Sequence, residues 1–156
     1  MIKSALRPPV SHQIIEKAQA PVSVETAFAV SQDYVHRLDW DPFLRIARLI
    51  DATEAGKGVR SYCESKSRIG METEYVSFDP PKTAAVKMTD GPFYFRNFAA
   101  SWRFLPKGPE SCEIIFTYSF ELQPILKPAT GLIKAVLRRE MRKRLHALTT
   151  CLVGKN

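Results

Sequence analysis

Hydrophobic and polar side chains alternate along most of the chain between residues 43 and 122, as they do in β-strands with one buried face. Turns rich in proline and glycine, such as Asp90-Gly91-Pro92, separate the alternating segments, and residues 11–19 form a similar segment nearer the start. The strands that this pattern predicts cover residues 11–19, 43–53, 59–69, 71–79, 82–89, 95–105 and 111–122. We therefore expect a curved antiparallel sheet of six or seven strands.

From residue 129 to residue 153 the apolar positions recur every three or four residues without a proline, which is typical of an amphipathic α-helix. About 25 residues make a helix of roughly 37 Å. Its apolar stripe consists of Ile133, Leu137, Met141, Leu145, Leu148 and Leu152. Two short helical stretches are expected after the first strand, one beginning near Pro21 and one within residues 33–41. The long helix would cover the concave face of the sheet, so the predicted fold class is α+β.

The length of 156 residues suits one domain, which we expect to span residues 11–156 after a tail at residues 1–10. No segment has the pattern of a signal peptide or of a membrane-spanning helix, and a cytoplasmic protein is expected. Cys63, Cys112 and Cys151 lie far apart and show no metal-ligand spacing. We therefore expect no disulfide framework, no metal site and no other cofactor.

The formal net charge of +7 is concentrated near the C-terminal end. Residues 127–156 contain eight Lys or Arg and one Glu, whereas residues 1–126 contain 15 basic and 15 acidic side chains. Much of the excess charge lies opposite the apolar stripe of the predicted helix, as a solvated face would. Peripheral membrane contact through this basic face is an alternative. Nucleic acid is not an expected partner, because the face has no interleaved aromatic residues.

The inner face of the predicted sheet is uneven. In strand 59–69 the charged side chains point outward and leave small ones inward: Ser61, Cys63, Ser65 and Ser67. Strand 71–79 is expected to turn Tyr75 inward and Val76 and Phe78 outward. The strands after residue 95 turn large aromatic rings inward instead. Small hydroxyl-bearing side chains opposite aromatic rings are typical of ligand cavities, although helix side chains that fill the space would fit the same pattern.

Several short motifs follow one another along the chain: Trp40-Asp41-Pro42-Phe43, Tyr75-Val76-Ser77-Phe78-Asp79-Pro80-Pro81, Asp90-Gly91-Pro92-Phe93, Trp102-Arg103-Phe104 and Cys112-Glu113-Ile114-Ile115-Phe116. In this order they resemble the START-like (SRPBCC, helix-grip) superfamily, particularly its polyketide cyclase/dehydrase and lipid-transport branch. The last part of the chain is also similar to coenzyme Q-binding START-like proteins. The resemblance covers residues 11–153 and implies a long helix that grips the sheet around an apolar cavity. It implies no particular reaction, because the superfamily mixes carriers, sensors, cyclases and hydrolases.

The candidate ligand-binding residues come from the inward strand positions, the helix stripe and the loop after the short helices. They are Trp40, Phe43, Ser65, Tyr75, Met88, Phe98, Trp102, Phe116, Tyr118, Leu137, Met141 and Arg144. Tyr75 and Tyr118 bring hydroxyl groups that suit a ligand carbonyl, and Trp40 and Phe43 suit the mouth of the cavity. Arg144 falls about 20° from the apolar stripe. It is expected to snorkel outward, to pair with a carboxylate on the sheet, or to neutralise an acidic ligand.

No nucleophile–base pair is readable in the sequence, so catalytic residues are not assigned. His36 lies near Asp39 and Asp41, where a His–Asp contact would orient the loop or act as an acid/base pair. Three functions stay open: binding or transport of an apolar small molecule such as a lipid, quinone or polyketide; a polyketide cyclase/dehydrase-type enzyme; and a module that binds a protein partner or a membrane surface. The sequence leaves open whether the protein is a monomer or a homodimer.

Overall fold

The computed structural model describes residues 11–155, so the predicted tail at residues 1–10 lies outside the described residues. The described part contains seven strands: β1 (His12–Ala20), β2 (Leu44–Ile50), β3 (Arg60–Ser65), β4 (Gly70–Asp79), β5 (Thr83–Asp90), β6 (Phe95–Gly108) and β7 (Ser111–Leu122). Its helices are α1 (Val24–Gln32), α2 (Arg37–Trp40), the 3-10 helix η1 (Pro124–Ala129) and α3 (Thr130–Val153). Each expected element is present, and the observed bounds differ from the expected ones by a few residues.

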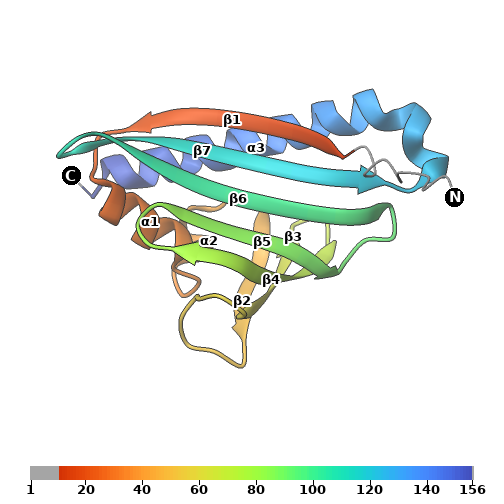
Figure 1. The fold of residues 1–156 in the computed structure, drawn as a ribbon, viewed down its shortest axis with the longest axis horizontal. Helices are drawn as coiled ribbons and strands as arrows, with labels where there is room; N and C mark the ends of the chain where they lie inside the picture. Colours follow the sequence, from red (N-terminus) through yellow and green to blue (C-terminus); the bar gives the residue numbers. More distant parts are fainter. Residues whose placement is uncertain (1–10, 156) are drawn as a thin grey trace, which may run out of the picture.

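The seven strands form one antiparallel sheet in the order β1-β7-β6-β5-β4-β3-β2. Figure 1 shows α3 running along β1 and β7 over the length of the sheet, with α1 and α2 at the end where the C-terminus lies. One long helix therefore lies across a curved sheet, and the predicted α+β helix-grip fold is confirmed.

The helix boundaries follow from local chemistry. At the start of α1 the side-chain oxygen of Ser23 accepts a hydrogen bond from the backbone N–H of Thr26 at 3.2 Å. Before α3, Pro124 and Pro128 cannot donate backbone hydrogen bonds, so the chain forms the short η1 helix first. As a result α3 begins at Thr130, one residue after the expected start.

The packed core lies at one end of α3. The side chains of α3 that are buried all belong to its C-terminal half, from Met141 onward, and Met141, Leu148 and Leu152 have no exposed surface. In the N-terminal half Leu132 is 70% exposed, while Ile133 and Leu137 are only partly buried. The helix thus packs tightly over half of its length and leaves space beneath the other half.

The expected face of Phe78 is wrong. The pairing of β4 with β5 shifts between Tyr75 and Ser77, which is a β-bulge that inserts one extra residue. After the bulge Phe78 points toward the core, where its ring packs edge-on against Phe28 at 5.3 Å between centroids and against Tyr75 at 5.4 Å. Val76 is exposed, as expected. The outward face of β4 therefore keeps only one of the two apolar side chains expected there.

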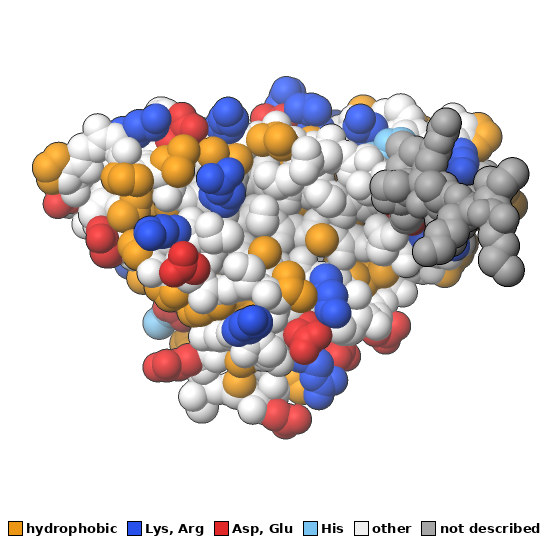
Figure 2. Space-filling model, in the orientation of Figure 1, with side chains coloured by type: hydrophobic (Ala, Val, Ile, Leu, Met, Phe, Trp, Pro, Cys, Tyr) orange, Lys and Arg blue, Asp and Glu red, His pale blue; other side chains and the backbone are white. Residues whose placement is uncertain are grey.

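Part of the basic helix face is held by ion pairs with the sheet. Arg138 Nη1 lies 2.7 Å and Arg142 Nε lies 3.1 Å from the same carboxylate oxygen of Glu16 on β1. Figure 2 shows acidic and basic side chains interspersed on the face of the molecule seen in Figure 1. A charged surface of this kind is the usual exterior of a soluble domain and by itself identifies no partner.

Candidate functional site

A cavity of about 630 Å³ lies between the sheet and the N-terminal half of α3. It is lined by residues from all the strands except β1, from α1, α2 and α3, and from the loops before β2 and around η1. The volume falls within the range of roughly 300–1,000 Å³ that small-molecule sites usually have. The space beneath the loosely packed half of the helix is therefore large enough for a ligand.

Two contrasting walls enclose the cavity. On β6 and β7, Trp102 stacks on Phe116 with 3.9 Å between ring centroids, and Phe98 packs edge-on against Tyr118 at 4.9 Å. The facing wall on β3, β4 and the turn between them carries small or flexible side chains: Cys63, Ser65, Ser67, Met71 and Thr73. The alternation of β3 predicted this contrast, because small inward side chains leave space in front of the aromatic wall.

Nine of the twelve candidate residues line this cavity: Phe43, Ser65, Tyr75, Phe98, Trp102, Phe116, Tyr118, Leu137 and Arg144. The other three candidates do not. Met141 lies one turn beyond Leu137, where the helix already meets the closed core. Met88 packs beside Gly91, where an added Cβ would lie 2.6 Å from the Met88 sulfur. Trp40 is buried under Arg37, whose guanidinium carbon lies 4.8 Å from the Trp40 ring centroid.

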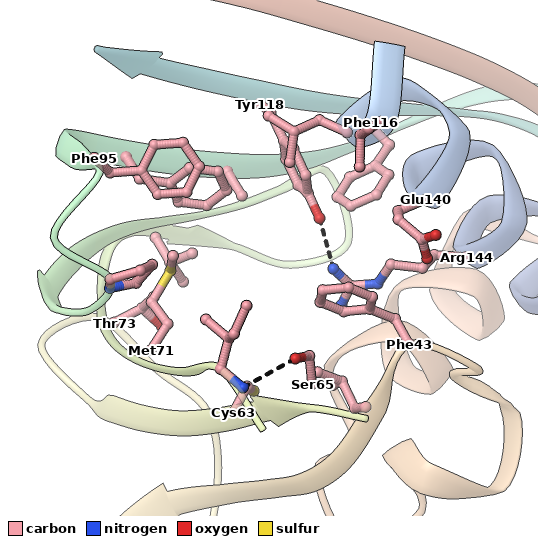
Figure 3. A pocket seen from close by; sticks show the side chains of 18 of the residues that line it. Phe43, Cys63, Ser65, Met71, Thr73, Phe95, Phe116, Tyr118, Glu140 and Arg144 are labelled. Carbon is pink, nitrogen blue, oxygen red and sulfur yellow. Dashed lines mark hydrogen bonds between the residues drawn. The ribbon is translucent and has the colours of Figure 1, made fainter. Parts of the chain in front are cut away.

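A buried polar cluster at one end of the cavity joins three charged side chains. Asp41 Oδ2 accepts hydrogen bonds from Arg37 Nε at 3.0 Å and from Arg144 Nη2 at 2.9 Å and Nε at 3.2 Å. Its Oδ1 accepts the backbone N–H of Phe43 at 3.1 Å. Arg144 Nη1 also donates to the Tyr118 hydroxyl oxygen at 2.6 Å, a contact visible in Figure 3. Arg144 therefore pairs with a carboxylate and does not snorkel into solvent, but Asp41 lies at the end of α2 and not on the sheet, where the partner was expected.

The protonation states of the cluster follow from burial and neighbouring charges. Burial alone would raise the pKa of Asp41, but the guanidiniums of Arg144 and Arg37 outweigh it and hold this pKa at about 2. Burial disfavours the charge on Arg144, yet Tyr118 and Asp41 favour it more strongly, so the Arg144 pKa lies above its ordinary value. Burial raises the pKa of Tyr118 despite the nearby Arg144. The cluster at neutral pH thus holds two cations, one anion and a neutral phenol.

The two candidate tyrosines differ in what their hydroxyl protons do. Tyr75 donates its proton to the side-chain oxygen of Gln32 at 2.6 Å, and burial raises the pKa of Tyr75. The Tyr118 oxygen accepts from Arg144, and no hydrogen bond to the described residues uses the Tyr118 proton. Tyr118 is consequently the better placed of the two to donate to a bound molecule.

Sequence reasoning missed the cluster in which Arg37 and Arg144 both pair with Asp41. Arg37 and Asp41 stand four residues apart, the spacing at which helical side chains meet, and this was the available signal. Nothing local indicated that Arg144 would join them, because 103 residues separate it from Asp41. His36 forms its contact with Asp33 at 2.7 Å in an exposed turn, not with Asp39 or Asp41.

The cavity opens to solvent between α3 and the turns at the edge of the sheet. Ile69, Leu132 and Val136 line it there and are 43%, 70% and 54% exposed. Phe93 and Ile125 are next in sequence to the lining residues Pro92 and Leu126, and they are 79% and 83% exposed. These five apolar side chains, Ile69, Phe93, Ile125, Leu132 and Val136, form what we call the apolar rim.

Within residues 11–155, no helix is long and apolar enough to cross a membrane. Among the same residues, no group of three or more His, Cys, Asp or Glu side chains is arranged to hold a metal ion. The three cysteines are free thiols.

Solved structures with the same architecture are helix-grip proteins. A START superfamily protein from Mycobacterium smegmatis has a TM-score of 0.79 and 14% identity, with 93% of this chain and 99% of that one covered. The Zhui aromatase/cyclase from Streptomyces has a TM-score of 0.78 and 13% identity, with 90% and 93% covered. Norcoclaurine synthase from Thalictrum flavum, in complex with a transition-state analogue, has a TM-score of 0.73 and 15% identity, with 96% and 98% covered. These identities establish the fold alone.

The sequence itself matches a family model over residues 11–152, nearly the whole chain. The protein belongs to the polyketide cyclase/dehydrase and lipid transport family, as the motifs indicated. No curated protein matches the sequence closely enough to suggest a more specific relative.

Proposed function

We propose that this protein binds an apolar small molecule, such as a lipid, quinone or polyketide, in the cavity between the sheet and α3. The observation that supports this most directly is the 630 Å³ space, walled on one side by the stacked Trp102 and Phe116 rings. A void of this size in an apolar interior forfeits dispersion contacts that a normally packed core would keep. A bound molecule would restore those contacts, and that gain drives binding.

The first test is native mass spectrometry of freshly purified protein, followed by organic extraction. A stoichiometric apolar adduct is the expected result. Wild-type protein stripped of the adduct should then bind the neutral fluorescent probe N-phenylnaphthylamine and rebind the extracted molecule.

Two alanines on β6 provide a matched pair of variants. Ala100 lines the cavity, whereas Ala99, next in the strand, is directed to the opposite face of the sheet. Ala100→Phe should fill the space and weaken probe binding at least about tenfold, which corresponds to about 1.4 kcal/mol. Ala99→Phe should leave binding unchanged. Equal binding by both variants, or a bare mass with no probe uptake by the wild type, would contradict a ligand-filled cavity.

A cyclase or dehydrase is a second candidate, favoured by the contact between Tyr118 and Arg144. A cationic donor on the phenol oxygen makes the phenol a stronger donor, and a donor of this kind stabilises an enolate oxygen that develops during cyclisation. The test is incubation with a β-polyketo thioester mimic, with cyclised product followed by mass spectrometry. Product formed by wild type and lost in Tyr118→Phe supports an enzyme, and no product in either supports a carrier.

The apolar rim supports contact with an anionic membrane from which an apolar ligand would be taken. Its most exposed members, Phe93 and Ile125, lie within three residues of Arg96 and Lys127 along the chain, so apolar and basic residues follow one another there. Wild-type protein is expected to sediment with phosphatidylserine-containing vesicles, and Phe93→Asp should reduce the bound fraction. Binding that is the same for neutral and anionic vesicles, or absent for both, would remove the membrane from the proposal.

A further inference from the structure

The polar cluster lies in a wall that is otherwise apolar. Arg37 and Arg144 both line the cavity, and both are more than nine-tenths buried. Figure 3 shows Arg144 reaching toward Tyr118 at the side of the cavity where Phe43 and Glu140 also lie. A charged group in such surroundings is costly unless its charge and its hydrogen-bond donors are both matched.

The donors of the cluster outnumber its acceptors. A guanidinium carries five N–H groups. Arg144 uses its Nε, Nη1 and Nη2 atoms for one hydrogen bond each to the described residues. Arg37 uses its Nε atom for one hydrogen bond to Asp41, and its Nη1 atom donates to the Ser31 carbonyl oxygen at 2.8 Å. Two N–H groups of Arg144 and three of Arg37 therefore have no acceptor among these residues, and the Tyr118 proton adds one more.

The charges of the cluster do not balance either. Arg37 and Arg144 contribute two positive charges, and Asp41 contributes one negative charge, which leaves one positive charge in excess. Glu140 also lines the cavity, but its side chain is 30% exposed and its Oε1 atom lies 3.7 Å from Lys143 Nζ. Its negative charge is therefore already paired with a cation outside the cluster. Asp41 already accepts four hydrogen bonds, so it has little capacity left to satisfy the remaining donors.

We propose that this end of the cavity is a carboxylate-binding subsite, so that the ligand is an apolar molecule that ends in a single carboxylate, such as a long-chain fatty acid. One carboxylate brings the missing negative charge and two acceptor oxygens, which the unused N–H groups of Arg37 and Arg144 and the Tyr118 O–H can reach from the cavity wall. A dianionic phosphate would reverse the excess charge instead of cancelling it. A neutral ester or alcohol would leave it uncancelled. The aromatic wall then holds the hydrocarbon chain.

This inference rests on the proposed function, and a ligand series in the wild-type protein separates the two. Oleic acid, methyl oleate and oleyl alcohol share one hydrocarbon chain and differ only at the end, and each is titrated below its aggregation concentration at neutral pH. Oleic acid should bind at least about tenfold more tightly than the ester and the alcohol. Equal affinity for all three would overturn the carboxylate subsite and leave the apolar cavity standing, whereas no binding of any of them would contradict both.

Two arginines on α3 supply the matched variants. Arg144→Met should remove the preference for the acid and leave ester binding within about twofold. Arg142→Met is the control, because Arg142 is exposed and pairs with Glu16 on the outside. Should Arg144→Met fail to fold, Tyr118→Phe keeps every charge and removes only the hydroxyl, and it should weaken oleic acid binding a few-fold more than ester binding. A preference for the acid that survives in a folded Arg144→Met would overturn the proposal.

Discussion

Replacing Asp41 by asparagine tests how strongly the buried cluster depends on its one negative charge. At neutral pH the change leaves the guanidiniums of Arg37 and Arg144 facing each other with no counter-charge. Removing one partner from a buried ionic group typically costs about 3–5 kcal/mol. We expect a loss of that size in the free energy of unfolding, measured by urea denaturation at pH 6.

The pH dependence sharpens this prediction. The pKa of Asp41 is about 2 in the folded protein, against 3.8 for an unperturbed aspartate, and its side chain is fully buried. Because the folded pKa is the lower one, the stabilisation is present above about pH 4 and is lost as the pH falls through about 2. Each tenfold change in proton affinity is worth about 1.4 kcal/mol, so the loss amounts to about 2.5 kcal/mol.

Comparing the wild type with Asp41→Asn cancels the acid titration of every other carboxylate. The gap in unfolding free energy between the two proteins should shrink by about 2 kcal/mol between pH 6 and pH 2, where folded Asp41 is half protonated, since protonated aspartic acid resembles asparagine. Ion pairs on the surface, such as those of Glu16, contribute equally to both proteins. A gap that stays constant over this range would refute the reasoning, because it would mean that the charge of Asp41 is not what the cluster needs.

Two further predictions concern the bulge and the basic helix face. Val76→Thr, at an exposed position, should change the unfolding free energy by less than about 0.5 kcal/mol. Phe78→Ala should lower it by at least about 2 kcal/mol in the same urea titration, because Phe78 packs against Phe28. Similar losses for both variants would contradict the bulge. Glu16→Gln releases Arg138 and Arg142 at the surface and should cost less than about 1 kcal/mol, with the difference from wild type shrinking as salt is added. A larger loss that salt does not affect would show that this contact is effectively buried.

The sequence predicted the sheet, the long helix and the unequal walls because each depends on a local period that marks a buried face. Phe78 escaped this reasoning, since a bulge changes the period at one residue and leaves no trace in hydrophobicity. Leu137 and Met141 occupy the same helix stripe, and only the position of the core decides that one faces the cavity and the other does not. The pairing of Arg144 with Asp41 depends on the tertiary fold, so no local pattern could reveal it.

The unequal packing of α3 also bears on how quickly a ligand could be exchanged. The half of the helix from Met141 onward is tied into the core, while the half that covers the cavity rests on the partly buried Ile133 and Leu137. Segments with few buried contacts open at a lower free-energy cost than the whole domain does. Lifting the first turns of α3 would therefore admit or release a ligand without disturbing β1, β7 and the rest of the core. The residence time of the ligand and the lifetime of the fold are consequently separate quantities, which mutations at opposite ends of one helix can change independently.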